Sequence, residues 1–210
     1  MEDFIHQNSL ELVGELDSLP TFSHKNHDVA FYRFLLAVER LSGQKDLLPV
    51  LVSLNVLEEC GSMEPGSTYR VLGQLRSFNN KSSTGSRLVI SAYAQSICPT
   101  EEEESQNRLF LAGAICKPPT LRRTPLGRSI SDIMLAVNRR YGRADYLPCI
   151  AWGQVANQLS QQNVGSCISF FGRFQSRIYT KQTECGPMEH TAYEVSIMHL
   201  APEQDEDFSF

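Results

Sequence analysis

The sequence lacks the short motifs that usually mark an enzyme. It contains no glycine-rich phosphate loop, no H-E-x-x-H and no G-x-S-x-G. A nuclease would need a cluster of carboxylates for its metal, yet the basic part of the chain, residues 107–200, holds only five scattered acidic residues. Serine, cysteine and histidine show no local arrangement for nucleophilic catalysis. We therefore expect a protein that binds a ligand, needs no cofactor and is not an enzyme.

Metal-binding and membrane-spanning patterns are also missing. The six cysteines form no C-x-x-C pair and have no cysteine or histidine at zinc-finger spacing. This predicts reduced, mostly buried thiols and no metal site. No charged-then-apolar signal segment follows Met1, and no apolar run approaches the roughly 20 residues of a membrane span. These absences predict a cytoplasmic protein that does not enter a membrane.

What the sequence does contain is an internal repeat. When residues 8–77 are shifted by 99 positions they align with residues 107–176 without a gap, and 19 of the 70 pairs are identical. Beyond this block, Leu88–Ala92 aligns best with Tyr193–Ile197, at an offset of 105. The chain is therefore a tandem duplication, and the differences between its two copies are informative.

The two copies differ strongly in charge. The whole chain has a formal net charge of −5, but residues 107–200 alone carry +6. Residues 1–100 carry −3, and both the segment 101–106 and the end of the chain, 201–210, carry −4. The second copy is thus basic within an acidic protein, which favours a polyanionic ligand for that copy.

Apolar periodicity predicts the fold of the second copy. Alternating residues indicate strands near 108–115, 129–140, 146–152, 166–179 and 191–200. Helical spacing indicates a helix over 154–162, and the prolines and glycine of 117–127 indicate a loop. Three strands, a helix and two further strands form the order of a five-stranded OB barrel.

The first copy has the same order of elements. Strands are expected near 9–16, 31–41, 48–53, 68–78 and 87–97, with a helix around 55–63. We therefore predict an all-β fold of two tandem OB-fold five-stranded barrels, each with one short helix. The first barrel spans residues 1–98 and the second 107–200, followed by an acidic tail, 201–210. The connection 99–106 includes four consecutive like charges, Glu101–Glu104, which favour an extended, solvated linker.

Cations and aromatic rings alternate on the predicted exposed faces of the second copy. Sequence-tolerant binding of a single nucleic-acid strand needs cations beside the phosphates and rings on which bases stack. The candidate residues are Lys117, Arg122, Arg123, Arg139, Arg140, Tyr141, Arg143, Tyr146, Trp152, Phe171, Arg173, Arg177 and Tyr179. Each has a simpler explanation as rim packing or solvated surface, and Trp152 in particular could point into the core.

Four segments of the second copy resemble the bacterial single-stranded DNA-binding proteins. They are 124–127 (TPLG), 135–139 (LAVNR), 146–153 (YLPCIAWG) and 172–177 (GRFQSR). The resemblance is strong over about 107–200 and extends to 8–97 only through the repeat. It implies that Tyr141, Tyr146, Trp152 and Tyr179 stack bases, in DNA replication, recombination or repair. Members of that family place four OB barrels in one assembly, so the resemblance implies a homodimer of this two-barrel chain.

The first copy does not keep these residues. At the four aromatic positions it has Ser42, Leu47, Ser53 and Asn80, and among the cations compared only Arg139 keeps its charge, as Arg40. We hypothesise that the second copy binds the strand and that the first serves mainly as a packing or oligomerisation partner.

The end of the chain resembles the tip by which the same family docks replication and repair proteins. An acidic stretch is closed by apolar residues, and the candidate docking residues are Asp205, Glu206, Asp207, Phe208 and Phe210. The alternative function is that of an accessory protein resembling the primosomal replication proteins, which would bind DNA weakly and recruit partners. RNA also stays open as a ligand, because stacking surfaces accept either sugar.

Overall fold

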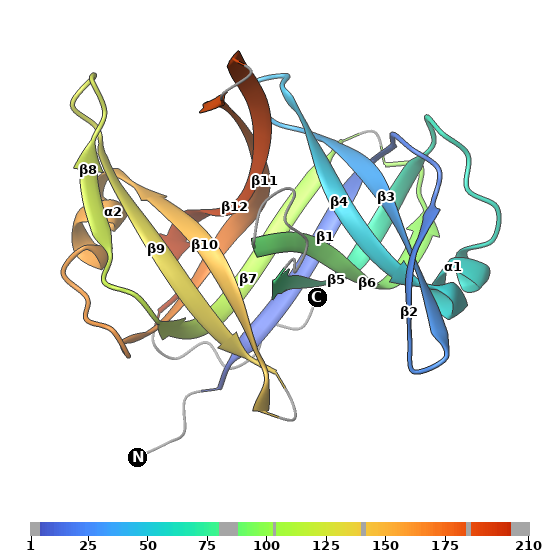
Figure 1. Cartoon of the computed structure of the whole chain (residues 1–210), viewed down its shortest axis with the longest axis horizontal. Helices are drawn as coiled ribbons and strands as arrows, with labels where there is room; N and C mark the ends of the chain where they lie inside the picture. The colour runs from blue at the N-terminus through green and yellow to red at the C-terminus, as the bar shows by residue number, and fades with distance from the viewer. Residues whose placement is uncertain (1–4, 80–87, 103, 140–141, 184–185, 203–210) are drawn as a thin grey trace.

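The computed structural model describes residues 5–79, 88–102, 104–139, 142–183 and 186–202, and it contains two β-barrels side by side (Figure 1). The first copy comprises β1 (Gln7–Leu16), β2 (Thr21–Asn26), β3 (Val29–Glu39), β4 (Lys45–Ser53), α1 (Leu54–Cys60), β5 (Thr68–Asn79) and β6 (Leu88–Pro99). The second comprises β7 (Gln106–Ile115), β8 (Thr120–Arg123), β9 (Ser129–Asn138), β10 (Ala144–Trp152), α2 (Gly153–Leu159), β11 (Cys167–Thr183) and β12 (Gly186–Leu200).

Each copy closes into a barrel by the same strand pairing. In the first, β1 pairs with both β3 and β5, and β4 runs parallel to β6. In the second, β7 pairs with both β9 and β11, and β10 runs parallel to β12. The five predicted strands and the short helix are present in each copy. The prediction of two tandem OB folds is therefore confirmed.

The structure contains two short strands that the sequence did not predict. β2 and β8 each extend the edge of a sheet by pairing with β3 and β9, and β8 lies within 117–127, for which a loop was predicted. Every residue of both strands is exposed. Neither segment therefore carries the apolar alternation by which a half-buried strand is recognised.

The offset of 105 predicted for the last strands is wrong. Gly73 pairs with Ala94, and its repeat equivalent Gly172 pairs with Ile197, so the last strands correspond at an offset of 103. The strand pairs β5–β6 and β11–β12 also have a register shift at the same place, just before that glycine. An error of two residues leaves the inward and outward alternation of a strand unchanged, so apolar patterning could not detect it.

The two copies are joined by their first strands. β1 pairs antiparallel with β7, and Leu10 lies opposite Leu109, its own equivalent in the repeat. Pairing of equivalent residues makes the junction two-fold symmetric, as in a dimer of identical subunits. The result is one sheet of twelve described strands that runs through both barrels.

Two arginine–aspartate pairs fasten the copies to each other. Arg40 donates to both oxygens of buried Asp46 at 2.7 and 2.6 Å and to the carbonyl of Ser176 at 2.8 Å. The backbone N–H of Ser176 donates to Asp46 at 2.9 Å. The repeat equivalents Arg139, Asp145 and Ser77 form the same arrangement in the opposite direction.

Burial alone would raise the pKa of Asp46. The hydrogen bonds from Arg40 and Ser176 outweigh this effect and hold the pKa below its usual range. The same contact with Asp46 raises the pKa of Arg40. Both shifts favour the charged forms that hold the copies together.

The cysteines and the connection differ from the sequence expectation. Among the five described cysteines, which are free, only Cys149 is buried, whereas Cys98 and Cys167 are exposed, so the prediction of mostly buried thiols is wrong. In the connection, Glu102 forms an ion pair with Arg70 of β5 and accepts a hydrogen bond from Gln106. No described helix is both long and apolar enough to cross a membrane.

Candidate nucleic-acid interface

The outer face of β10 carries two exposed aromatic side chains. Leu147, Cys149 and Ala151 point into the barrel and are buried. Tyr146 and Trp152 lie on the opposite face with exposed fractions of 49% and 42%. The orientation of Trp152, which the sequence left open, is therefore outward, and both rings are available for stacking.

The far end of β11 carries a second aromatic group. The ring of Tyr179 stacks on His190 of β12 with 5.7 Å between ring centroids, and the guanidinium of Arg177 lies 5.5 Å from the centre of the Tyr179 ring. Arg177 also contacts Glu194 at 3.5 Å. The cation and the ring predicted to act together are thus adjacent.

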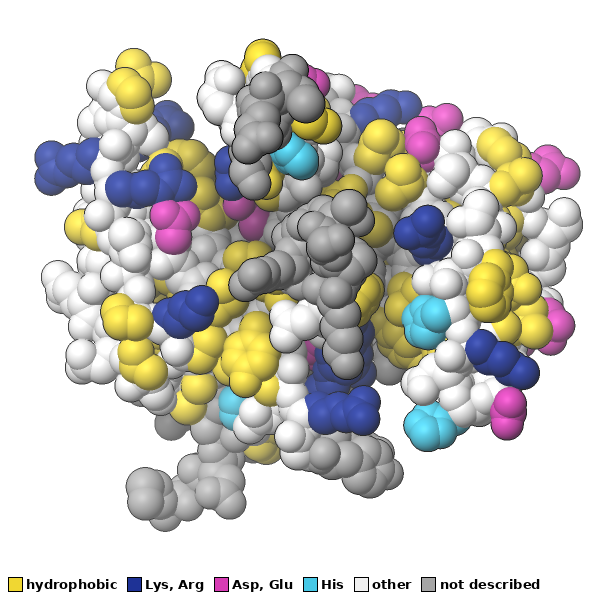
Figure 2. All heavy atoms as spheres, viewed as in Figure 1, with side chains coloured by type: hydrophobic (Ala, Val, Ile, Leu, Met, Phe, Trp, Pro, Cys, Tyr) yellow, Lys and Arg dark blue, Asp and Glu magenta, His cyan; other side chains and the backbone are white. Residues whose placement is uncertain are grey.

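The first loop and β8 carry three exposed cations. Arg122 donates to Asp132 at 2.6 Å, and this hydrogen bond raises the pKa of Arg122. Lys117 and Arg123 make no ion pair with any residue that the structure describes. In the view of Figure 2, Lys and Arg side chains project over the β8 side of the molecule with a few acidic side chains near them, and side chains of both charges are scattered over the first copy.

The turn after β9 lies at the junction between the copies. Arg139 forms an ion pair with Asp145 and donates to the carbonyl of Ser77 in the first copy. This arginine, which both copies retain, therefore holds the copies together in addition to contributing positive charge to the surface. Arg143 is exposed and lies beside it. The backbone N–H of Tyr146 donates to the hydroxyl of Ser77 at 2.7 Å, which anchors β10 on the first copy.

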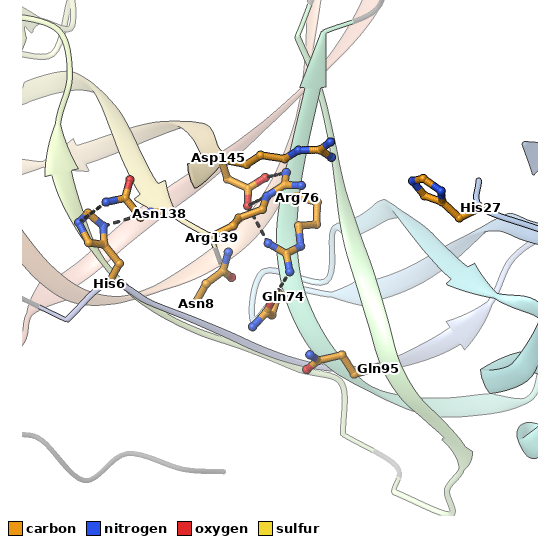
Figure 3. A pocket seen from close by; sticks show the side chains of 10 residues that line it. His6, Asn8, His27, Gln74, Arg76, Gln95, Asn138, Arg139 and Asp145 are labelled. Atoms are coloured by element: carbon orange, nitrogen blue, oxygen red, sulfur yellow. Dashed lines mark hydrogen bonds and ion pairs between the residues drawn. The ribbon is translucent and has the colours of Figure 1, made fainter. Parts of the chain in front are cut away.

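This turn forms one wall of a groove of about 1030 Å³ between the copies. The lining residues are His6, Asn8, His27, Gln74, Arg76, Gln95, Asn138, Arg139, Arg143 and Asp145. In Figure 3, Asp145 lies between Arg139 and Arg76, and His27 lies apart from them on the side of the first copy. Three arginines against one aspartate give this junction groove a net positive charge, which suits a phosphate chain.

His6 is a further member of the junction groove that the sequence did not single out. Its Nδ1 accepts a hydrogen bond from the backbone N–H of Asn138 at 3.1 Å. Burial lowers the pKa of His6 below its usual value. The neutral ring therefore serves as an acceptor that holds the segment just before β1 against the end of β9.

Phe171 and Arg173 lie apart from the residues at the end of β11. The ring of Phe171 packs between Phe110 and His199, at centroid distances of 5.0 and 4.9 Å. Tyr179 lies eight positions after Phe171 on the same strand, a span of about 26 Å. The predicted residues thus form several groups along the second copy rather than one cluster.

Some candidates lie outside the described residues. These are Arg140 and Tyr141 in the turn after β9, and the five residues proposed for partner docking, Asp205, Glu206, Asp207, Phe208 and Phe210.

The sequence comparison missed the contribution of the first copy to the junction groove. Gln74, Arg76, Gln95 and His27 line it, and Arg76 binds Asp145 of the second copy at 3.0 Å. The comparison between the copies started from the rings and cations of the second copy. Arg76 was missed because its equivalent in the second copy is the uncharged Gln175. An arginine present only in the first copy was the available signal.

The closed barrels define a tandem OB-fold protein whose second barrel carries exposed rings and cations. The same architecture occurs in the wild-type single-stranded DNA binding protein from Thermus aquaticus. That crystal structure matches with a TM-score of 0.74 over 98% of both chains at 22% identity, a likeness that concerns the fold.

Sequence comparison then identifies the family. The model of the single-strand binding protein family matches residues 106–201. Single-stranded DNA-binding protein B of Bacillus subtilis is 34% identical over 83 residues, which cover 36% of this chain and 74% of that protein. The chain belongs to the single-strand binding protein family.

Other relatives are matched over a smaller share of their length. Single-stranded DNA-binding protein 1 of Lactococcus lactis is 34% identical over 83 residues, 36% of this chain and 55% of that protein. The chain thus spans about half the length of the first curated relatives that it matches.

Proposed function

We propose that this protein binds single-stranded DNA without strong sequence preference, mainly through its second copy, in DNA replication, recombination or repair. The observation that carries the proposal is the exposed Tyr146 and Trp152 on β10, in the half of the chain that matches the family. Exposed rings of this kind stack bases, at about 1–3 kcal/mol per base. The relatives are named for the same ligand.

The cations of the second copy neutralise phosphates in this proposal. Lys117, Arg123, Arg143 and Arg173 make no ion pair with any described residue, so phosphates can approach them without displacing a carboxylate. Arg122 and Arg177 would exchange a carboxylate contact for a phosphate. The protein acts by holding the strand, without catalysis, in the cytoplasm.

Further parts of the proposal concern partners. We infer a homodimer, and docking of replication or repair proteins by the tail 205–210. The division of labour follows the predicted segments: 1–98 as a barrel with a reduced binding surface, 99–106 as connection and 107–200 as the main binding barrel.

Tryptophan fluorescence tests the proposed function directly, because Trp152 is the single tryptophan. Titration with an oligo-dT of about 35 nucleotides should quench its emission strongly. Raising the salt should weaken binding, with a log–log slope of roughly −0.7 per phosphate contacted. Absence of binding at low salt would contradict the proposed function. The variants Trp152→Ala and Tyr179→Ala should lose most affinity, whereas Phe78→Ala should not. Fluorescence anisotropy of a dye-labelled oligo-dT measures these variants, because Trp152→Ala removes the single tryptophan.

A further inference from the structure

A row of aromatic rings runs along the outside of the first copy. His24 of β2 stacks on Phe31 of β3 with 5.0 Å between centroids and 10° between ring planes. Phe31 lies 6.3 Å from Tyr93 of β6. The guanidinium of Arg76 lies 5.7 Å from the centre of the Tyr93 ring. His24, Phe31 and Tyr93 are called the aromatic row below.

The aromatic row has no counterpart in the second copy. By the repeat, His24 and Phe31 correspond to Arg123 and Ile130. Gln74 pairs with Tyr93, and its equivalent Arg173 pairs with Ser196, so Ser196 replaces Tyr93. The first copy has therefore lost the rings of the second copy and carries a different set at other positions.

Arg76 connects the aromatic row to the junction groove. The same guanidinium that lies against Tyr93 binds Asp145 at 3.0 Å and lines the groove together with Arg139 and Arg143 of the second copy. His27, in the turn between β2 and β3, lines the groove from the first copy (Figure 3). Cations and rings thus follow one another from the second copy to the first.

The equivalent side of the junction is different. The pseudo-symmetric side of the junction has the repeat equivalents of the groove residues. There, Asn138, Arg143 and Arg76 of the groove are replaced by Glu39, Gln44 and Gln175. The other equivalent positions that carry a charge are Arg40, Asp46 and Arg173. Together with Glu39, this side therefore has two arginines and two carboxylates, and its net charge is zero. Only one of the two pseudo-symmetric sides thus has the excess positive charge that a phosphate chain requires.

We propose that the aromatic row is a second base-stacking site, and that a single strand bound on the second copy reaches it through the junction groove. This inference rests on the proposed function and extends it to the first copy. The exposure of the row agrees with this role. His24 is exposed and stacks on Phe31, and Phe31 and Tyr93 are half-buried, so these side chains are partly packed and partly accessible. Packing that fixes a ring in advance lowers the entropy cost of stacking on it.

Oligonucleotide length separates the two sites. We would compare the wild-type chain with the variant Phe31→Leu/Tyr93→Leu, using an oligo-dT of about 10 nucleotides, within the range one OB fold covers, and one of about 30 nucleotides. The variant should bind the short strand as the wild type does. Its affinity for the long strand should fall about tenfold or more, because stacked bases are lost. Phe78→Leu is the matched control, an aromatic ring on β5 with 45% exposure outside the row.

Equal affinity of variant and wild type for the long strand would overturn the inference and leave the proposed function intact. An equal loss for both lengths would also overturn it, since the row would then affect the second copy. Photo-crosslinking of the wild-type chain to a 30-nucleotide strand provides a test that needs no variant. Crosslinks to Phe31 or Tyr93 are expected. Crosslinks confined to the second copy would refute the role of the aromatic row as a stacking site. Failure of the wild type to bind either strand would instead refute the proposed function.

Discussion

At the scale of single residues, the repeat retains polar side chains that hold the fold together. Asn8 exchanges two hydrogen bonds with the backbone of Leu75, at 2.7 and 2.9 Å. Its equivalent Asn107 does the same with Phe174, at 2.6 and 2.9 Å. Arg139 belongs to this group too, because it and Arg40 complete equivalent contacts across the junction. A residue kept in both copies is therefore explained by the fold before it is explained by a ligand.

Asp46→Asn should lower the free energy of unfolding at neutral pH by about 3 kcal/mol, because it leaves Arg40 without the charge of its buried partner. The measurement is urea denaturation at pH 7. Asp132→Asn is the control, because the ion pair of Asp132 with Arg122 is about half exposed and should contribute less than about 1 kcal/mol. A loss no larger than that of the control would refute the stabilising role of the Asp46 contact.

The pH dependence of stability should also change in Asp46→Asn. The pKa of Asp46 in the folded state lies below its value in the unfolded chain. Its stabilisation is therefore present above about pH 4 and is lost as the pH falls through the folded pKa. Denaturation curves from pH 6 to pH 3 should show a smaller acid loss for the variant than for the wild type. Parallel curves would contradict this assignment.

At the scale of elements, barrel closure depends on two glycines in equivalent strands. A Cβ on Gly14 of β1 would lie 2.5 Å from the carbonyl oxygen of Ala37, and one on Gly113 of β7 would lie 2.6 Å from that of Ala136. Both carbonyls belong to the strands that close the barrels, β3 and β9. A side chain at either position would push apart strands that must pair.

Gly113→Ala should therefore destabilise the protein by about 1–3 kcal/mol, the usual cost of overpacking a core. Thermal unfolding of the variant and the wild type measures the effect. Ser169→Ala, on the neighbouring strand β11, is the control and should change stability by less than about 0.5 kcal/mol. A Gly113→Ala variant as stable as this control would show that the strands can separate without cost.

At the scale of the whole molecule, the chain is a fused version of a symmetric pair. β1 and β7 meet at equivalent leucines, and the arginine–aspartate pairs cross the junction in both directions. Once fused, the copies were free to differ, and the charge, the rings on β10 and the aromatic row do differ. The proposed division of roles between the copies rests on this asymmetry.

The expected homodimer can be measured by sedimentation equilibrium. The mass should be twice the 23.6 kDa of the chain, because the resemblance implies assemblies of four barrels and each chain supplies two. Measurement over a range of concentrations separates a stable dimer from a weak one. A mass of one chain at every concentration would exclude the homodimer, without bearing on the strand-binding surface.

The duplication, the five strands and helix of each barrel, and the aromatic and basic character of the second copy could all be predicted from the sequence. These properties depend on local periodicity and composition, which a sequence displays directly. It could not determine that β2 and β8 are strands, because exposed edge strands bury no side chains. Nor could it show that Trp152 points outward or that the last strands correspond at an offset of 103.

Which residues contact one another across the two copies is visible only in the folded chain. Asp46 accepts a hydrogen bond from Ser176. Arg76 forms an ion pair with Asp145 and lies over the ring of Tyr93. Residues from both copies line one groove. These contacts join residues that are distant in the chain. Their geometry follows from how two barrels pair along β1 and β7, which no local pattern encodes. For this reason the sequence could predict a binding surface on the second copy but not that residues of the first copy line the same groove.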